Sequence, residues 1–150
     1  MRKVLLFCFI LCLSPSLTTG EFIDNGDGTI TDKGTGLMWE KEGPGPRMSW
    51  EAAITYCESL SLAGYDDWRL PNIKELRSIL DYRRYNPAID TSCFPATVPF
   101  YYWSSTTYPT DSSEAWSINF FSGYDYGGHE YSSLKSLKRH VRAIRGGYSR

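Results

Sequence analysis

Two adjacent carboxylates, Asp66 and Asp67, lie in the segment YDDWRLPN together with the indole of Trp68 and the guanidinium of Arg69. General acid–base catalysis and calcium binding both use carboxylates of this kind. Neighbouring side chains of an extended segment point to opposite faces, however, and no further acid lies close enough in sequence to complete an oxygen cage. We therefore expect no metal here and interpret the segment as the approach to a helix, with Arg69 paired to a carboxylate.

A second group of reactive side chains lies near the C-terminus. Residues 131 to 150 contain no acid but six cations, which are Lys135, Lys138, Arg139, Arg142, Arg145 and Arg150. Clustered cations release counterions from a polyanion and bind it in a salt-dependent way. The segment is therefore a candidate docking site for a sulfated or phosphorylated polymer, and the alternative is a solvated last strand with a basic tail.

Aromatic residues form the third group, and they alternate with Ser, Thr, Asp and Gly in the second half of the chain. They are Tyr101, Tyr102, Trp103, Tyr108, Tyr124, Tyr126 and Tyr131. Rigid rings beside adaptable polar side chains suit the recognition of sugars or protein surfaces. Since alternate residues of a strand turn inward, part of this set is expected to belong to the core.

The first 20 residues have the order of a secretory signal peptide. Arg2 and Lys3 precede ten apolar residues, VLLFCFILCL, which are too few to span a bilayer, and small residues follow. We expect export to the periplasm or the cell exterior, a mature chain that begins near Glu21, and no membrane insertion after cleavage. Lipid attachment at Cys12 is disfavoured because the preceding Leu11 is bulky.

Residues 21–150 have the length of one domain, and no linker or repeat divides them. Without the signal peptide, 14 basic residues face 17 acidic ones, which gives a net formal charge of −3. That balance predicts neither nucleic-acid binding nor membrane binding for the chain as a whole.

The mature chain keeps two cysteines, Cys57 and Cys93, because Cys8 and Cys12 belong to the signal peptide. An even number in an oxidising compartment favours a disulfide, which would stabilise the fold by about 3 to 4 kcal/mol. Two buried free thiols are the alternative. A Cys–His nucleophile is not expected, because both histidines lie late in the chain with no evident group to orient them.

Two helices are predicted from apolar spacing. The first, in MSWEAAITYCESL, has Ser49 as N-cap and an apolar face of Trp50, Ala53, Ile54, Cys57 and Leu60. The second, in PNIKELRSILDY, has an apolar face of Ile73, Leu76, Ile79 and Leu80. Asn72 and Glu75 have the spacing of a capping box at its start.

The rest of the chain is rich in strand patterns. In DNGDGTITD, the pairs Asn25–Gly26 and Asp27–Gly28 indicate a hairpin turn rather than a calcium loop, whose acid spacing they do not fit. Alternating apolar residues predict a strand in AWSINFFSG, and GLMWEK, YYWSSTTY and HVRAIRG are read as further strands. The expected class is α+β with antiparallel sheets.

Six ordered blocks resemble a known family: GTITDKGTGLMWEK, SWEAAITYCESLSLAGYDDWRLPNIKELRSILDY, NPAID, YYWSSTTY, AWSINFFSG and VRAIRGG. Together they look like the Lcl C-terminal-like domain, a bacterial domain of unknown function named after a collagen-like adhesin. More distantly, the chain is similar to sulfatase-modifying-factor proteins. The resemblance implies a C-type-lectin-like fold, with two helices on twisted antiparallel sheets and the two termini close together.

Departures from these families limit what the resemblance implies. Many similar chains carry a second cysteine in the last strand, where Ala143 stands here, so Cys93 is the remaining partner for Cys57. The formylglycine-generating family holds copper with a late cysteine pair, and no cysteine follows Cys93. Calcium-dependent lectins use a Trp-Asn-Asp strand, whereas Ser117 and Ile118 follow Trp116 here. We expect no enzyme activity, cofactor or metal.

The resemblance to an adhesin domain implies an exported, non-catalytic module that binds glycans or sulfated polysaccharides. The expected ligand-binding residues are Tyr124, Tyr126, Tyr131, Lys135, Lys138 and Arg139. The alternatives are a protein-interaction or structural domain of the cell envelope, and an enzyme related to the sulfatase modifiers. The chain has no Gly-X-Y tract that would impose a collagen trimer, and its oligomeric state is not predicted.

Overall fold

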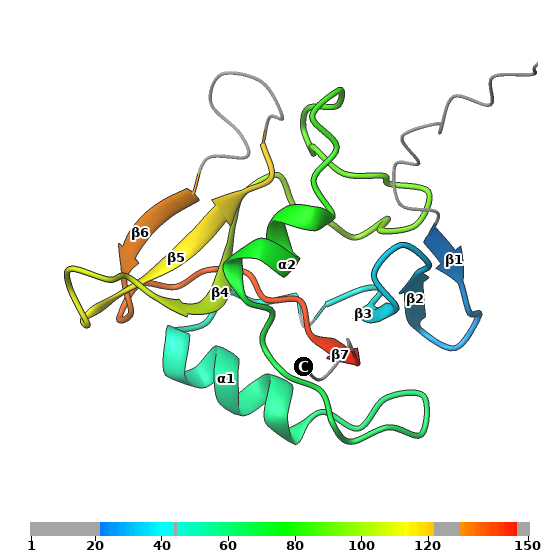
Figure 1. Cartoon of the computed structure of the whole chain (residues 1–150), viewed down its shortest axis with the longest axis horizontal. Coiled ribbons are helices and arrows are strands. Elements are labelled where there is room, and N and C mark those ends of the chain that lie inside the picture. The colour runs from blue at the N-terminus through cyan, green and yellow to red at the C-terminus, as the bar shows by residue number, and fades with distance from the viewer. Residues whose placement is uncertain (1–21, 44, 122–129, 147–150) are drawn as a thin grey trace, which may run out of the picture.

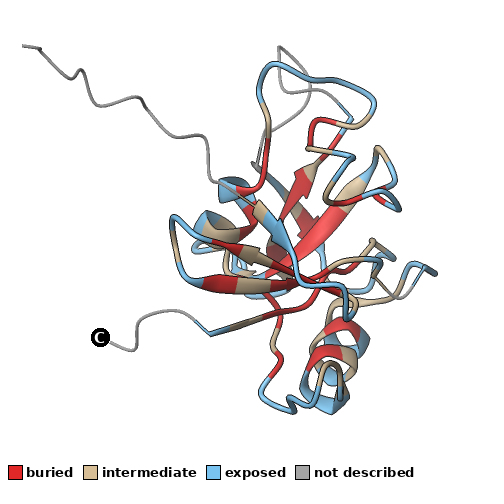
Figure 2. Ribbon diagram, turned by 90° about the vertical axis from the view of Figure 1, so that its right-hand side faces the viewer, coloured by how far each residue is buried: buried red, intermediate tan, exposed pale blue. Residues whose placement is uncertain are grey.

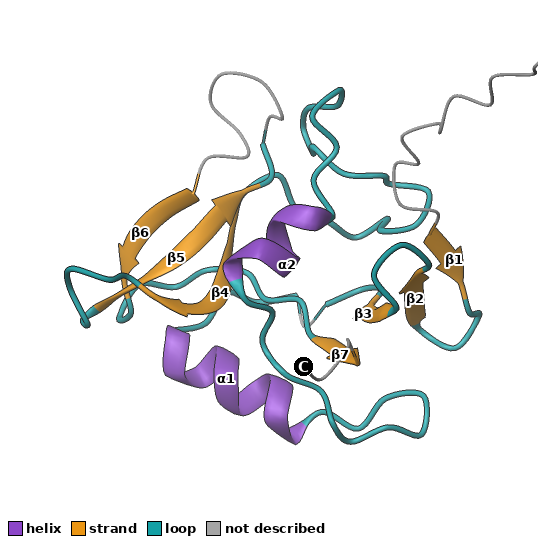
Figure 3. Ribbon diagram, viewed as in Figure 1, coloured by secondary structure: helices purple, strands orange, loops and turns teal. Residues whose placement is uncertain are grey.

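The computed structural model describes residues 22–43, 45–121 and 130–146. Its elements, in chain order, are β1 (Phe22–Asp24), β2 (Thr29–Asp32), β3 (Leu37–Glu40), α1 (Trp50–Ser59), α2 (Ile73–Ser78), β4 (Tyr101–Thr107), β5 (Glu114–Asn119), β6 (Glu130–Leu134) and β7 (Ile144–Gly146). Within these ranges the predicted α+β class is confirmed, with two antiparallel sheets and two short helices (Figure 3).

The two sheets lie on opposite sides of α2 (Figure 1). One has the strand order β1-β2-β3-β7 and the other β4-β5-β6. The last strand therefore returns to the N-terminal sheet, where Ile144 is opposite Trp39. The segment before β7 runs alongside β4, and His140 in that segment forms a bridge with Tyr102. Only Ile144–Gly146 of the predicted final strand is regular strand, because the preceding residues connect the two sheets.

The predicted turn between β1 and β2 is confirmed. Asp24 accepts a hydrogen bond from the backbone N of Gly26 (3.0 Å), and Asp27 accepts from the backbone N and hydroxyl of Thr29 (3.1 and 2.6 Å). Gly26 and Gly28 have φ angles of 75° and 88°, which favour glycine. The carboxylates thus close the turn on their own backbone.

The segment YDDWRLPN leads into a helix, as predicted. Asn72 accepts from the backbone N of Glu75 (2.9 Å), and Glu75 accepts from the backbone N of Asn72 (2.8 Å), which completes the capping box of α2. Arg69 donates two hydrogen bonds to the same Glu75 carboxylate (2.8 and 2.7 Å). Asp67 pairs with Arg145 (2.6 Å), so its carboxylate joins the helix approach to β7.

Helix α1 also begins as predicted, since Ser49 accepts from the backbone N of Ala52. Helix α2 is shorter than predicted and ends at Ser78, although Ile79 and Leu80 beyond it are still buried. Their burial explains why an apolar pattern extends past the last helical turn. None of the helices in the described ranges is long and apolar enough to cross a membrane.

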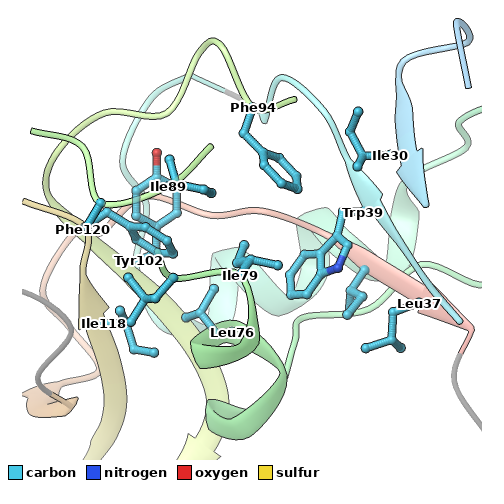
Figure 4. Packing of buried hydrophobic residues seen from close by; sticks show 13 residues of the cluster. Ile30, Leu37, Trp39, Leu76, Ile79, Ile89, Phe94, Tyr102, Ile118 and Phe120 are labelled. Atoms are coloured by element: carbon cyan, nitrogen blue, oxygen red, sulfur yellow. The ribbon is translucent and has the colours of Figure 1, made fainter. Parts of the chain in front are cut away.

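Buried residues, red in Figure 2, line the inner side of both sheets and of the helices. Within the described residues their hydrophobic side chains form two clusters. The first lies around α2, between the sheets, and includes Trp39, Leu76, Phe94, Tyr102 and Ile118 (Figure 4). The second packs beneath α1 and contains Ala53, Cys57, Trp68, Leu70, Trp103, Ala115, Val141 and Ala143. The last segment of the chain contributes to both, since Ile144 belongs to the first cluster.

Of the C-terminal cations in the described residues, one lies in the core. Arg142 is 2% exposed and its guanidinium is 5.0 Å from the ring centroid of Phe94. It donates to the carbonyl oxygens of Glu40 (2.6 Å) and Lys41 and to the Thr97 hydroxyl (2.9 Å). Arg142 is therefore a structural residue. Both interpretations of residues 131 to 150, a docking site for an anionic polymer and a solvated last strand, are wrong at this position.

We expect Arg142→Met to lower the free energy of unfolding by about 3 kcal/mol, because it leaves buried acceptors without a donor. The measurement is urea denaturation followed by circular dichroism. Arg83→Met is the control, since the Arg83 side chain is 71% exposed, and its effect should stay within about 0.5 kcal/mol. Equal losses in the two variants would contradict a structural role for Arg142.

Candidate functional site

Four of the six predicted ligand-binding residues lie in the described part of the chain. Tyr124 and Tyr126 lie outside the described residues, whereas Tyr131 belongs to β6 and the three cations follow that strand. Lys138 is exposed. The Lys135 ammonium lies 3.9 Å from the ring centroid of Trp50 and 3.1 Å from the Thr107 hydroxyl. Lys135 is thus occupied by a cation–π contact of its own.

Tyr131 and Arg139 meet on one face of the second sheet. The register places Trp103 opposite Ser117 and Ser117 opposite Tyr131, so the side chains of Trp103 and Tyr131 share a face with that of Tyr101. The rings of Tyr101 and Tyr131 are 5.4 Å apart in an edge-to-face arrangement. The Arg139 guanidinium lies 4.7 Å from the Tyr101 ring centroid.

Two residues that were not predicted as ligands, Arg47 and Phe100, extend this face. The Arg47 guanidinium is 5.5 Å from the ring centroid of Phe100, which is 5.2 Å from that of Tyr101 and 6.3 Å from that of His140. Arg47 and Tyr131 are exposed, and Phe100 is partly exposed. We call this surface the cationic aromatic face and define it by Arg47, Phe100, Tyr101, Tyr131 and Arg139. His140 lies at its edge, since its ring centroid is 5.2 Å from that of Tyr102, which points to the opposite side of β4 from Tyr101.

Backbone hydrogen bonds fix the positions of the cations. Met48 and Arg139 form an antiparallel bridge with N···O distances of 2.9 and 3.0 Å, which brings Arg47 beside the C-terminal segment. The backbone N of His140 donates to Tyr101 (2.9 Å), and its carbonyl accepts from Trp103 (3.0 Å). Arg47 is isolated among Gly and Pro residues in the sequence, so no local pattern indicates this contact.

The positive charges of the face repel one another. Burial lowers the pKa of Arg139; the phenol of Tyr101 raises it, and the positive charge of Arg47 lowers it. Burial also lowers the pKa of His140, and Arg47 lowers it further. A like charge disfavours the protonated form, so an anion bound between these cations would relieve the repulsion. The arrangement is chemically suited to an oxoanion flanked by aromatic rings.

The predicted disulfide is not formed. Cys57 and Cys93 are free thiols, with Cys57 buried in the cluster beneath α1 and Cys93 packed against the cluster around α2. The spacing of the two cysteines in the sequence does not show that they belong to different clusters. Burial raises the pKa of the Cys57 thiol, which therefore stays protonated at neutral pH. Within the described ranges, no three His, Cys, Asp or Glu side chains gather as a metal ion would require.

The fold and the face define a small α+β domain in which cations lie on aromatic rings at the surface. In a comparison with protein families, the family described as the Lcl C-terminal domain matches residues 28–145. The match runs from just before β2 into β7. The chain therefore belongs to the Lcl C-terminal domain family, a family of unknown function, which confirms the resemblance seen in the sequence. A search of curated proteins found no significantly similar sequence.

Alkylation of the unreduced, unfolded protein followed by peptide mapping should find both Cys57 and Cys93 modified. In the native protein, we expect Cys93 to react at least about tenfold faster than Cys57, because the buried Cys57 has the raised pKa. Recovery of a disulfide-linked pair of peptides containing these two cysteines would contradict the structure.

Proposed function

We propose that this protein is an exported, non-catalytic module that binds sulfated polysaccharides through the cationic aromatic face, in an adhesin-like role. The observation that carries the proposal is the position of Arg139, whose guanidinium lies on the Tyr101 ring while Arg47 is close enough to lower its pKa. Two cations and exposed rings on one face offer complementary contacts to sulfate groups and to the sugars that bear them.

The chemistry of each partner supports this assignment. A guanidinium presents a planar set of donors that matches the oxygens of a sulfate, and it keeps its charge at every physiological pH. Tyr101 and Tyr131 provide rigid apolar surface for the C–H faces of sugar rings at a low cost in side-chain entropy. Lys138, exposed beside Arg139, would add a long-range attraction.

The remaining predicted ligand residues take secondary roles in this proposal. Lys135 would contact a longer polymer from its place on Trp50. Tyr124 and Tyr126 precede β6 in the chain, and the β6 residue Tyr131 belongs to the face. Tyr124 and Tyr126 are proposed as further stacking residues on the basis of sequence alone.

We also propose export and a C-type-lectin-like fold. The basic and apolar order of residues 1–20 supports export to the periplasm or the cell exterior. The fold assignment draws support from the two helices, the two antiparallel sheets and the pairing of β3 with β7, which joins the beginning and end of the domain. Fold alone does not give function, so the polysaccharide assignment depends on the face.

A protein-interaction or structural role in the cell envelope is the second candidate. The observation that favours it is the exposure of Leu134 and Leu137, which are 47% and 42% exposed on the segment that precedes Arg139. An apolar contact of this kind would hold a protein partner at high salt, whereas polysaccharide binding through cations would be lost. Retention of a partner as salt rises therefore separates the two functions.

We expect Arg47→Ala and Arg139→Ala each to weaken binding to immobilised heparin by about tenfold, because each removes a charge-assisted contact. The measurement is surface plasmon resonance at constant ionic strength, with thermal unfolding as a check on folding. Arg83→Ala is the matched control, because it removes an exposed arginine outside the face. If all three variants bind heparin equally, the proposal fails.

Heparin binding should strengthen as the pH falls from about 6.5 to 5, because His140 becomes positively charged only below its lowered pKa. Since the protonated form is the one that attracts sulfate, the sign of the effect is a gain in affinity toward acid. His140→Gln should flatten that part of the pH profile and leave binding at pH 8 unchanged. If the variant shows the same pH profile as the unmodified protein, His140 does not contribute to heparin binding.

A further inference from the structure

A cavity of about 380 Å³ lies between β1 and the segment that follows α2. It shares no residue with the cationic aromatic face. Phe22, Ile79 and Leu80 contribute apolar lining, and Asp81, Tyr82, Arg84 and Asp90 are among the polar residues around it. In Figure 1 this segment is the green loop that continues from the end of α2. The volume is in the range of ligand pockets.

The charges that line the cavity balance. Arg83 and Arg84 oppose Asp81 and Asp90, so the lining has no net formal charge. Asp81 accepts from Arg83 Nε (2.9 Å) and Arg84 Nε (3.0 Å). The hydrogen bond from Arg83 lowers the pKa of Asp81 to about 2, which keeps the carboxylate ionised at neutral pH. A polyanion therefore gains little here, in contrast to the cationic aromatic face.

The ion pairs orient a donor and an acceptor side by side. Arg84 Nη2 is 3.5 Å from Asp90 Oδ1, and Arg84 Nε is held by Asp81. Arg84 can still donate through its other terminal nitrogen, Nη1. The second carboxylate oxygen of Asp90 has the Cys93 thiol 4.0 Å away, which is a weak donor, so it can accept from a ligand.

Tyr82 adds an aromatic wall with a polar tip. The residue is 48% exposed, and its hydroxyl oxygen accepts from Arg77 Nε at 3.3 Å. The hydroxyl hydrogen can therefore be donated elsewhere. The cavity as a whole combines apolar surface, one aromatic ring, and an adjacent donor and acceptor.

We propose that this cavity binds an uncharged sugar ring. A pyranose has an apolar C–H face, which Tyr82 and Phe22 can cover, and neighbouring hydroxyls that donate to Asp90 and accept from Arg84. A fully apolar ligand would leave that donor and acceptor unpaired, which is costly, and a charged ligand would meet a like charge beside each opposite one. The site is chemically distinct from the polyanion face, and it stands whether or not that face binds sulfate.

The test is an NMR titration of the isotope-labelled protein with the methyl glycosides of glucose, galactose, mannose and N-acetylglucosamine, up to tens of millimolar. We expect at least one sugar to produce saturable shifts in the backbone amides of residues 80 to 84 and 90. Tyr82→Ala and Arg84→Gln should each lower the affinity for that sugar by about fivefold or more, because each removes roughly one hydrogen bond or ring contact. Tyr82→Phe retains the ring and should weaken it less.

Tyr85→Ala is the matched control, because Tyr85 is 77% exposed and does not line the cavity. It should bind the sugar as the unmodified protein does. The proposal is overturned if none of the four sugars gives saturable shifts, if the shifts fall on Tyr101 and Tyr131 instead, or if Tyr82→Ala and Arg84→Gln bind like Tyr85→Ala. Heparin binding is measured on the same samples, so failure at this cavity is distinguished from failure at the cationic aromatic face.

Discussion

The structure depends on one segment, from Arg139 to Ile144, that holds the two sheets together. Its backbone bridges Met48 at one end and pairs with β3 at the other. Between them the buried Arg142 donates to the carbonyls of Glu40 and Lys41, and the backbone N of Ala143 donates to the Glu40 carboxylate (3.0 Å). Buried polar groups of this kind are costly unless every partner is present. The segment therefore has little freedom to shift along either sheet.

That constraint also determines the candidate site. Arg139 and His140 immediately precede the buried stretch, so their positions on β4 follow from the same hydrogen bonds that join the sheets. The rings of Tyr101 and Tyr131 are placed by strand register, independently of the cations. The rings thus lie on a rigid sheet, and the fixed C-terminal segment places the Arg139 guanidinium over the Tyr101 ring. Such preorganisation lowers the entropy that a ligand must overcome on binding.

Local chemistry in the sequence was sufficient to predict the parts of the fold that local interactions determine. The capping box at Asn72 and Glu75 and the turn at Asn25–Gly28 each need residues only a few positions apart, and both are present. Arg142 was misread because its acceptors, Glu40 and Lys41, lie about a hundred residues earlier, at separations of 102 and 101. The disulfide between Cys57 and Cys93 was misread for a similar reason, since composition cannot tell which cluster each thiol joins.

The candidate site shows the same division. Tyr131 and Arg139 were predicted from aromatic and basic composition, and the structure brings them to one face. Arg47 and Phe100 were missed, because a single arginine in a Gly- and Pro-rich stretch and a phenylalanine after a proline carry no spacing signal. Their contribution arises from the bridge between Met48 and Arg139, which is a tertiary contact. The run of positive charge in the sequence indicated the C-terminal segment. Which residues join the cationic aromatic face depends on tertiary contacts.

The most direct test of the central claim is a crystal structure of the protein with a heparin-derived tetrasaccharide. Our account predicts a sulfate group within hydrogen-bond distance of the Arg139 guanidinium, with a sugar ring against Tyr101 or Tyr131. A tetrasaccharide bound elsewhere, with Arg139 and Arg47 making no contact to it, would contradict the account.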